Sequence, residues 1–357
     1  MDILDNPFRR AGLPRDAGLA DGEIVTDPAA AMALHARCPR AAETPLLSLD
    51  ALAAEAGVAA LDVKDERARM GLGSFKALGA AHAIAKQAAP AIDAGTPPGE
   101  ALAGRTFVCA SAGNHGMSVA AGAAAFGARA IVFLAEPVPE AFAGRLRAKG
   151  AEVVRAGAVY EESMAAAGET AARQGFDLLP DSSWPGCTEP ARDVMEGYLV
   201  MAEEAARQIS SPPTHIFLQA GVGGLAAACA AAARNHWGAA PLIVVVEPEF
   251  APALKESVRA GRPVVAGGPV SAMGRLDCKE PSHLALKYLA READRFMTVG
   301  EEEAAGAVAR LAGLGIATTA SGAAGIAGLL AAAGTRTLGL DGESRVLAYL
   351  SEGPEDG

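Results

Sequence analysis

Residues 106–116 read TFVCASAGNHG: a buried strand is expected at 106–110, then a turn containing glycine, then the start of a helix. Residues 215–225, HIFLQAGVGGL, repeat this order, with a strand expected at 215–218. A parallel strand is normally followed by a turn and by a helix that crosses back over the sheet. The two segments therefore predict an α/β protein with a mainly parallel sheet.

The same alternation continues on both sides of these segments. Further apolar runs of strand length lie at residues 60–63, 130–134, 152–155, 242–247 and 345–350. Alanine-rich stretches of helical length fill most of the gaps. The stretch DAGTPPG at residues 93–99 cannot continue a helix, which predicts a hinge between domains, and a second boundary is expected near Pro180.

Composition narrows the class of protein. The chain has 357 residues, 51% of them hydrophobic, which suffices for one large domain or two ordinary ones. Its formal net charge of −11 argues against a nucleic-acid partner and against an anionic membrane. With only 4% aromatic residues, the composition favours tight packing of small side chains, and we expect a metabolic enzyme.

The five cysteines are dispersed and form no C-x-x-C pair, so we expect neither a disulfide framework nor a metal site. Charged residues interrupt the opening MDILDNPFRR, so it does not read as a signal peptide, and a cytoplasmic location is expected. Residues 216–233 and 311–335 are uncharged and long enough to span a membrane. Because glycine and polar residues break both stretches, we expect buried core instead.

Lys76 is a candidate nucleophile within GLGSFKALG, residues 71–79. In the first turn of a helix, among small and apolar neighbours, burial and the helix dipole are expected to lower its pKa. Such a lysine is suited to Schiff-base formation. The alternative is an exposed lysine that extends from its helix into solvent.

The two glycine turns are candidate anion sites. Backbone N–H groups in SAGNHG, at a helix start, are suited to a carboxylate, and those of GVGG at residues 221–224 to a phosphate. The second turn lacks the P-loop lysine, so it is not a Walker A loop. It also lacks the G-x-G-x-x-G spacing, which argues against a nucleotide-binding dehydrogenase. Tight strand-to-helix connections with no ligand are the alternative for each turn.

Taken together and in order, SFK at residues 74–76, SAGNHG and GVGGL resemble the fold-type II pyridoxal-phosphate enzymes, the superfamily of threonine dehydratase and tryptophan synthase β. Five motifs are similar to those of diaminopropionate ammonia-lyases: VKDE at 63–66, FKALG at 75–79, DSSW at 181–184, CKEPS at 278–282 and SGAAG at 321–325. The resemblance covers nearly the whole chain, from about residue 43 to residue 353.

The resemblance implies two three-layer α/β/α domains with mainly parallel sheets and pyridoxal 5'-phosphate in the cleft between them. Residues 1–96 and 179–357 would form the large cofactor-binding domain, and residues 97–178 a small mobile domain. A homodimer is the usual assembly of such enzymes.

The resemblance also implies roles for individual residues. Lys76 would carry the cofactor as a Schiff base, and Asp181 would act as the base at Cα, although Asp181 could instead cap a turn. The other expected cofactor contacts are Asn114 to the phenolic oxygen, Gly221, Val222, Gly223 and Gly224 to the phosphate, and Ser351 to the pyridine nitrogen. The expected substrate-binding residues are Ser111, Ala112, Gly113 and His115.

Several positions depart from the ammonia-lyase pattern. Ala112 stands where enzymes that accept both enantiomers have a second aspartate, and Ala320 where many relatives have a glutamate near the ring. Arg275 and Lys279 stand where small residues are usual. Such cations could pair with an anionic group at the far end of a substrate, or could be ordinary surface charge.

The resemblance therefore implies a pyridoxal-phosphate-dependent ammonia-lyase that eliminates the β-substituent of a small amino acid, giving a 2-oxo acid and ammonia. The expected substrate is 2,3-diaminopropionate, with the L-form preferred. The alternatives are a dehydratase acting on serine, threonine or 3-hydroxyaspartate, and a cofactor-binding amino-acid sensor without turnover.

Overall fold

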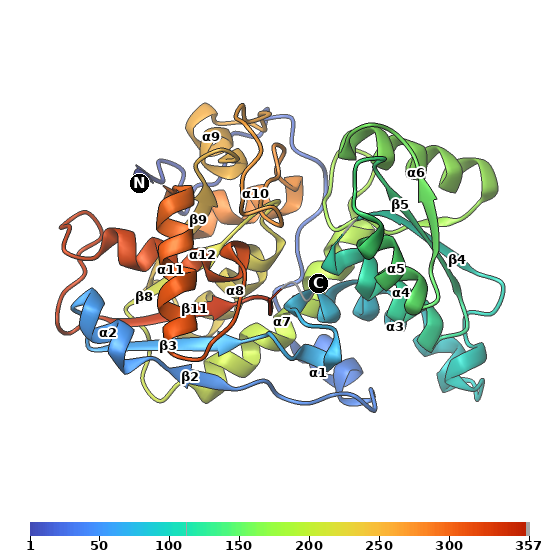
Figure 1. Cartoon of the computed structure of the whole chain (residues 1–357), viewed down its shortest axis with the longest axis horizontal. Coiled ribbons are helices and arrows are strands. Elements are labelled where there is room, and N and C mark those ends of the chain that lie inside the picture. Colours follow the sequence, from blue (N-terminus) through green and yellow to red (C-terminus); the bar gives the residue numbers. More distant parts are fainter. Residues whose placement is uncertain (112, 355–357) are drawn as a thin grey trace.

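The computed structural model describes residues 1–111 and 113–354, and these form two separate sheets flanked by helices (Figure 1). The larger sheet has seven strands in the described chain, in the spatial order β1 (Asp2–Asp5), β10 (Arg295–Val299), β9 (Leu242–Pro248), β8 (His215–Gln219), β11 (Arg345–Leu350), β3 (Ala60–Asp65) and β2 (Leu46–Ser48). The smaller has four, in the order β6 (Glu152–Arg155), β5 (Arg129–Leu134), β4 (Thr106–Ala110) and β7 (Asp177–Leu178).

Both sheets are mainly parallel, as the sequence predicts. Every pairing in the smaller sheet is parallel, and in the larger sheet only the edge strands β1 and β2 run antiparallel to their neighbours. All seven predicted strands are present, with ends shifted by at most two residues. The sequence reading missed β1, β2, β7 and β10.

The helices of the described chain are α1 (Ala29–Ala36), α2 (Asp50–Ala56), α3 (Gly79–Asp93), α4 (Asn114–Ala125), α5 (Glu140–Ala148), α6 (Tyr160–Gln174), α7 (Glu189–Gln208), α8 (Gly224–Trp237), α9 (Ala253–Ala260), α10 (His283–Glu292), α11 (Glu301–Gly313) and α12 (Ala320–Ala332). Short 3₁₀ turns lie at η1 (Arg69–Gly71), η2 (Phe75–Leu78) and η3 (Pro98–Glu100). None of the described helices has the length and apolarity needed to cross a membrane.

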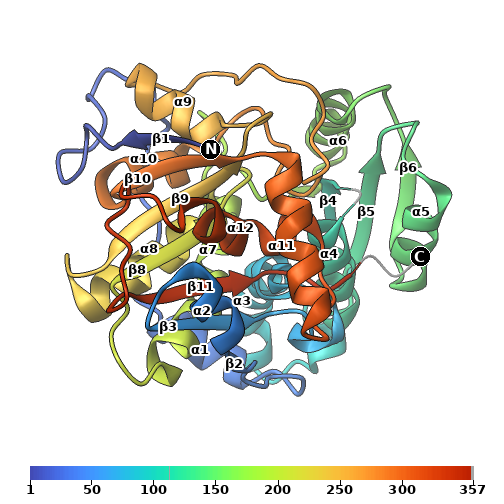
Figure 2. The same cartoon turned by 60° about the vertical axis from the view of Figure 1, so that its left-hand side comes forward.

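Alternating side chains fill the layers on the two faces of each strand. In β8, Phe217 packs on the α12 face, whereas Ile216 and Leu218 pack on the α8 face. The core on the α8 face continues through α7 and α3 to the α4 face of the smaller sheet, so one apolar cluster joins the two sheets. Figure 2 shows α11 and α12 covering the opposite face of the larger sheet.

The first long uncharged stretch is buried, as predicted, whereas the second is buried over most of α12 but exposed at residues 312–315. The first forms β8 and α8, and the second includes α12. The chain passes from the larger sheet to the smaller after α3, through the predicted loop at 93–99, and returns after β7. The domain limits at 96/97 and 178/179 remain a prediction.

Candidate active site

Lys76 lies at the junction of the two sheets, in η2, one turn before α3 begins. The preceding residues are fixed to the end of β11: Phe75 N donates to Ser351 O at 2.9 Å, and Ser74 forms an antiparallel bridge with Glu352. At the start of α3, a Cβ on Gly79 would lie 2.6 Å from the Tyr198 ring, so only glycine lets this segment pack so close to α7. These contacts hold Lys76 at the carboxyl end of β11.

The Lys76 ammonium forms an ion pair with the Asp181 carboxylate, 105 positions away in the sequence. Burial alone would lower the pKa of Lys76, but the negative charge of Asp181 outweighs burial, and that pKa is held above its ordinary value. The expected lowering of the Lys76 pKa is therefore wrong for this arrangement. The sequence reading included the helix dipole and burial but not a partner that only the fold supplies.

Asp181 itself is ionised. Burial alone would raise its pKa, but the positive charge of Lys76 outweighs burial and holds the pKa well below its ordinary value. Its side chain is 19% exposed, so the carboxylate is partly accessible. Asp181 is placed by the end of β7, through Leu179 and Pro180. The carboxylate is therefore in the ionised form that a general base requires, although its charge pairing with the Lys76 ammonium lowers its basicity.

His115 connects the start of α4 to this segment. Its Nε2 lies 2.8 Å from the carbonyl oxygen of Leu179, two residues before Asp181. Burial lowers the pKa of His115, so the ring is neutral at pH 7. The side chain of this expected substrate contact therefore positions the Asp181 segment. Ser111 Oγ accepts a hydrogen bond from Gly113 N at 3.2 Å, which shapes the same turn, while Ala112 lies outside the described residues.

The loop from Gly221 to Gly224 leads from β8 into α8 and is closely packed on one side. A Cβ on Gly221 would lie 3.0 Å from Cys278 Sγ, and one on Gly223 would lie 3.1 Å from Ala285 Cβ. Gly223 also has a φ of +102°, which favours glycine. Among the described residues, none accepts a hydrogen bond from the backbone N–H of Gly223 or Gly224.

These N–H groups stand at the start of a 14-residue helix. Unused donors at a helix N-terminus bind phosphate well. Because the glycines allow close backbone approach, the loop fits the phosphate group expected of the cofactor. The Val222 carbonyl accepts from Ser282 N at 2.9 Å, which anchors the loop to the start of α10.

Asn114 and Ser351 lie on opposite sides of the junction. Asn114, the first residue of α4, donates through Nδ2 to Glu352 Oε2 at 2.5 Å. Ser351 is buried immediately after β11, and its backbone N–H faces Gly322 O at 3.4 Å. The structure thus brings Lys76, Asn114, Asp181 and Ser351 to one region, as the resemblance implies, although their roles remain predictions.

Two residues in this region were not singled out from the sequence. Glu352 is buried and its carboxylate accepts from Asn114 and from Thr319 Oγ1. Its position two residues after β11, next to the expected cofactor contact Ser351, was the available signal. Tyr198 gave no sequence signal, because it lies on a largely apolar face of α7. Burial raises the pKa of its hydroxyl to about 12, so the hydroxyl is protonated at neutral pH.

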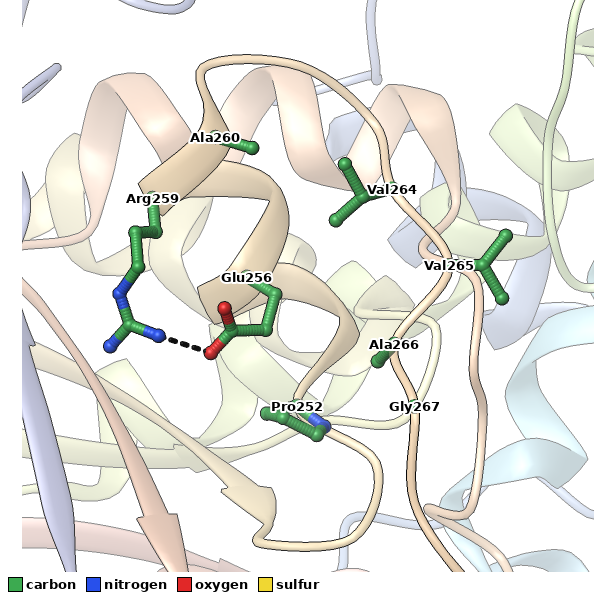
Figure 3. Close-up of a pocket in the computed structure, with 8 residues that line it drawn as sticks. All are labelled: Pro252, Glu256, Arg259, Ala260, Val264, Val265, Ala266 and Gly267. Atoms are coloured by element: carbon green, nitrogen blue, oxygen red, sulfur yellow. Dashed lines mark hydrogen bonds and ion pairs between the residues drawn. The ribbon is translucent and has the colours of Figure 1, made fainter.

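A hollow of about 460 Å³ lies elsewhere, between α9 and residues 264–267 (Figure 3). Its charged lining residues, Glu256 and Arg259, are bonded to each other, and it shares no lining residue with the Lys76 region. Among the described residues, no group of three or more His, Cys, Asp or Glu side chains is arranged to hold a metal ion. The Lys76 region is therefore the candidate active site.

Comparison with known proteins gives a consistent result. The family model for "Pyridoxal-phosphate dependent enzyme" matches residues 37–352. The diaminopropionate ammonia-lyase of Salmonella typhimurium is 34% identical over 70% of this chain and 67% of its own length, and that of Escherichia coli is 30% identical over 85% and 78%. A crystal structure of the E. coli enzyme with an aminoacrylate-PLP azomethine reaction intermediate superposes with a TM-score of 0.86 at 28% identity, covering 99% of this chain and 93% of that one.

Proposed function

The chain belongs to the pyridoxal-phosphate dependent enzymes, and from this premise we propose that it is an ammonia-lyase that acts on 2,3-diaminopropionate, with the L-form preferred. The products are a 2-oxo acid, pyruvate, and two molecules of ammonia for each substrate and water consumed. The observation that carries the proposal is the pairing of Lys76 with an ionised Asp181 beside the glycine loop at the start of α8.

The cofactor is pyridoxal 5'-phosphate, and the residues present fit it. Lys76 offers the amine for covalent attachment, and the N–H groups of Gly223 and Gly224 would hold the phosphate. Asn114 and Ser351 would face the ring. When bound, the cofactor withdraws electrons from Cα, so that the Cα–H bond weakens and the β-substituent can leave.

The chain's own residues hold the substrate and move the proton. The turn of Ser111 and Gly113 would bind the α-carboxylate, with the Ser111 hydroxyl as a donor. Asp181, held ionised by Lys76, would accept the Cα proton on its carboxylate oxygen. His115, through Leu179 O, keeps the Asp181 segment in place. Ser351 supplies a neutral hydroxyl, which favours β-elimination over aminotransfer because it cannot fully protonate a pyridine nitrogen.

A substrate panel tests this proposal. Purified holoenzyme is given L- and D-diaminopropionate, L-serine and L-threonine, and ammonia and 2-oxo acid are measured together. The proposal expects pyruvate and two equivalents of ammonia from L-diaminopropionate, faster than from the other three. A spectral change of the cofactor without product release from any of them would instead indicate an amino-acid sensor.

Two further properties are part of the proposal. A homodimer is the assembly that the family resemblance implies. A cytoplasmic location is supported by the five cysteines, all of which are free thiols in the described chain. Light scattering and cell fractionation test these two properties.

A further inference from the structure

The Tyr198 hydroxyl is a buried polar group that the proposed mechanism does not use. The residue is 1% exposed, and its Oη has no hydrogen-bond partner among the described residues. Burial raises the pKa of this hydroxyl to about 12, so it keeps its proton at neutral pH and can donate. A buried donor without an acceptor destabilises a fold, and phenylalanine would fill the same space without that cost. The hydroxyl is therefore suited to an acceptor that the described chain does not supply.

Close packing of α7 on the start of α3 fixes the Tyr198 side chain. A Cβ on Gly197 would lie 2.1 Å from Leu78 O, and a Cβ on Gly79 would lie 2.6 Å from Tyr198 Cε1 and 2.8 Å from its Oη. Only glycine at both positions allows this approach. The Phe75 ring also packs against the Tyr198 ring, with centroids 4.8 Å apart and an interplanar angle of 57°. The direction of the hydroxyl is therefore set by the fold.

The same ring reaches the start of α8. Tyr198 Cε2 lies 3.4 Å from the position that a Cβ on Gly224 would take, while Oη lies against Gly79. The hydroxyl end of the ring thus lies between the first residues of α3 and α8. At α3 the Gly79 N–H is already bonded to Lys76 O. At α8 the N–H groups of Gly223 and Gly224 have no acceptor within the described chain, so an O–H and two N–H donors are available at one place.

The charged groups nearest to the hydroxyl do not serve as its acceptor. Lys76 is close enough for its charge to act on the hydroxyl. An ammonium has N–H donors only, however, so a protonated tyrosine has nothing to donate to on Lys76. Asp181 is an acceptor, but its carboxylate is paired with the Lys76 ammonium and forms no hydrogen bond with Oη. An anion held at the start of α8 would complete the set.

We propose that the Tyr198 hydroxyl binds the phosphate of the cofactor, together with the N–H groups of Gly223 and Gly224. The inference rests on the cofactor of the family and not on diaminopropionate as the substrate. A phosphate monoester has three strongly accepting oxygens, so two backbone N–H groups leave room for a third donor. Hydrogen bonds from neutral donors to an anion are stronger than those between neutral groups, and burial strengthens them further.

Two ligands that differ only in the phosphate test the inference. Pyridoxal 5'-phosphate and pyridoxal are titrated into cofactor-free wild type and Tyr198→Phe, and the Schiff-base absorbance is followed. Both ligands bond to Lys76, so an effect on that lysine changes both affinities alike. In Tyr198→Phe we expect Kd for pyridoxal 5'-phosphate to rise at least tenfold, and Kd for pyridoxal to change less than twofold. The control Tyr288→Phe removes another buried tyrosine hydroxyl, one near Glu292 and Arg291, and should change neither.

Two further measurements distinguish a phosphate contact from simple packing. The phosphorus NMR resonance of the bound cofactor should shift in Tyr198→Phe and not in Tyr288→Phe, because hydrogen bonding alters the shielding of phosphorus. Cofactor-free Tyr198→Phe should melt at the wild-type temperature or above, because an unpartnered hydroxyl has been removed. The rise in melting temperature on adding pyridoxal 5'-phosphate should nevertheless be smaller than in wild type.

The outcomes separate this inference from the proposed substrate. An equal loss of affinity for pyridoxal 5'-phosphate and pyridoxal would overturn it, because the hydroxyl would then act on Lys76 or on the pyridine ring. Unchanged affinities and an unchanged phosphorus resonance would also overturn it and leave Tyr198 a packing residue. A selective loss for pyridoxal 5'-phosphate, in a wild type that releases no product from L-diaminopropionate, would refute the proposed substrate and support the phosphate contact.

Discussion

The Lys76 ammonium and the Asp181 carboxylate form an ion pair across the junction of the two sheets. Each raises the charged fraction of the other: the pKa of Lys76 lies above its ordinary value, and that of Asp181 lies below. Because β11 fixes the segment of Lys76 and β7 that of Asp181, the pair also reports how the two sheets are placed relative to each other.

The pair should stabilise the cofactor-free protein over a wide pH range. The folded-state pKa of Asp181 is lowered, so its contribution is present above its unfolded pKa of about 3.8 and is lost as pH falls through the lower folded value. The folded-state pKa of Lys76 is raised, so its contribution is present below about 10.5 and is lost as pH rises through the higher folded value.

A double-mutant cycle of Lys76→Met and Asp181→Asn, followed by denaturant unfolding of the cofactor-free protein, measures this coupling. We expect about 0.5–3 kcal/mol, constant from pH 5 to pH 9. A coupling energy near zero at pH 7 would mean that the two charges do not interact in solution.

Lys76→Ala should abolish covalent attachment of the cofactor, because Lys76 is the one lysine in the expected Schiff-base position. The measurement is the visible absorbance of the purified protein, together with borohydride reduction and peptide mapping. Lys64→Ala is not a suitable control, since that lysine is part of a buried ion network. Lys149→Ala is suitable, because Lys149 is exposed and lies directly after α5. A reducible bond to another lysine in Lys76→Ala would contradict the assignment.

Gly223→Val should weaken binding of the cofactor at least tenfold. Valine is strained at a φ of +102°, and its Cβ would crowd Ala285 and Leu254 at 3.1 Å, which displaces the backbone N–H groups. Gly57→Val is the matched control, because Gly57 also has a positive φ, +68°, but has open space around a Cβ and lies at the end of α2. Unchanged cofactor affinity in folded Gly223→Val would place the phosphate elsewhere.

A buried ion network behind the site should contribute strongly to stability. The Arg69 guanidinium donates to Glu66 at 2.7 Å and to Glu204 at 2.6 Å, and Lys64 lies 2.7 Å from Glu204. Removing one partner leaves buried charge unpaired, so Glu204→Ala should cost about 3–5 kcal/mol in the free energy of unfolding. The exposed pair of Arg129 and Glu152 gives the control: Glu152→Ala should cost less than about 1 kcal/mol.

The sequence was most informative where structure is local. Strands such as β4 and β11 are continuous apolar runs, and their bounds were predicted to the residue. Two edge strands lack such a run: β1, with the sequence DILD, and β7, which has two residues. They form strands because they pair with segments that are distant in the sequence, so no local pattern predicted them. In the site, motif order indicated Lys76 and Asp181, but the direction of the Lys76 pKa shift depended on a contact between residues 105 positions apart.

Tertiary contacts also decide the roles of two cations that the sequence analysis singled out. Arg275 and Lys279 were indistinguishable in the sequence, four residues apart on one loop. Folding turns the first toward Gly113 and bonds the second to Phe250 and Pro269. Which of the two cations contacts the turn at Gly113 therefore depends on tertiary contacts that no local pattern encodes.

The stereochemical prediction depends on which base remains. Asp181 is present and ionised, whereas Ala112 stands where the resemblance implies an aspartate for the opposite face. Because one carboxylate reaches only one face of Cα, the protein should process L-diaminopropionate and leave the D-isomer nearly untouched. Asp181→Asn should lose about 10²–10⁴-fold in kcat while retaining the cofactor absorbance, since the amide keeps the shape but cannot accept the proton.

Lys76 is the rival base, because its amine is beside Asp181 and is released when a substrate replaces it on the cofactor. Asp181→Asn distinguishes the two: if Lys76 takes the proton, L-turnover stays near normal. The decisive measurement is stopped-flow loss of deuterium from Cα-deuterated L-diaminopropionate in wild type and Asp181→Asn. A primary isotope effect that persists at an undiminished rate in the variant would assign the proton to Lys76. Equal turnover of the two enantiomers by wild type would contradict the L-preference.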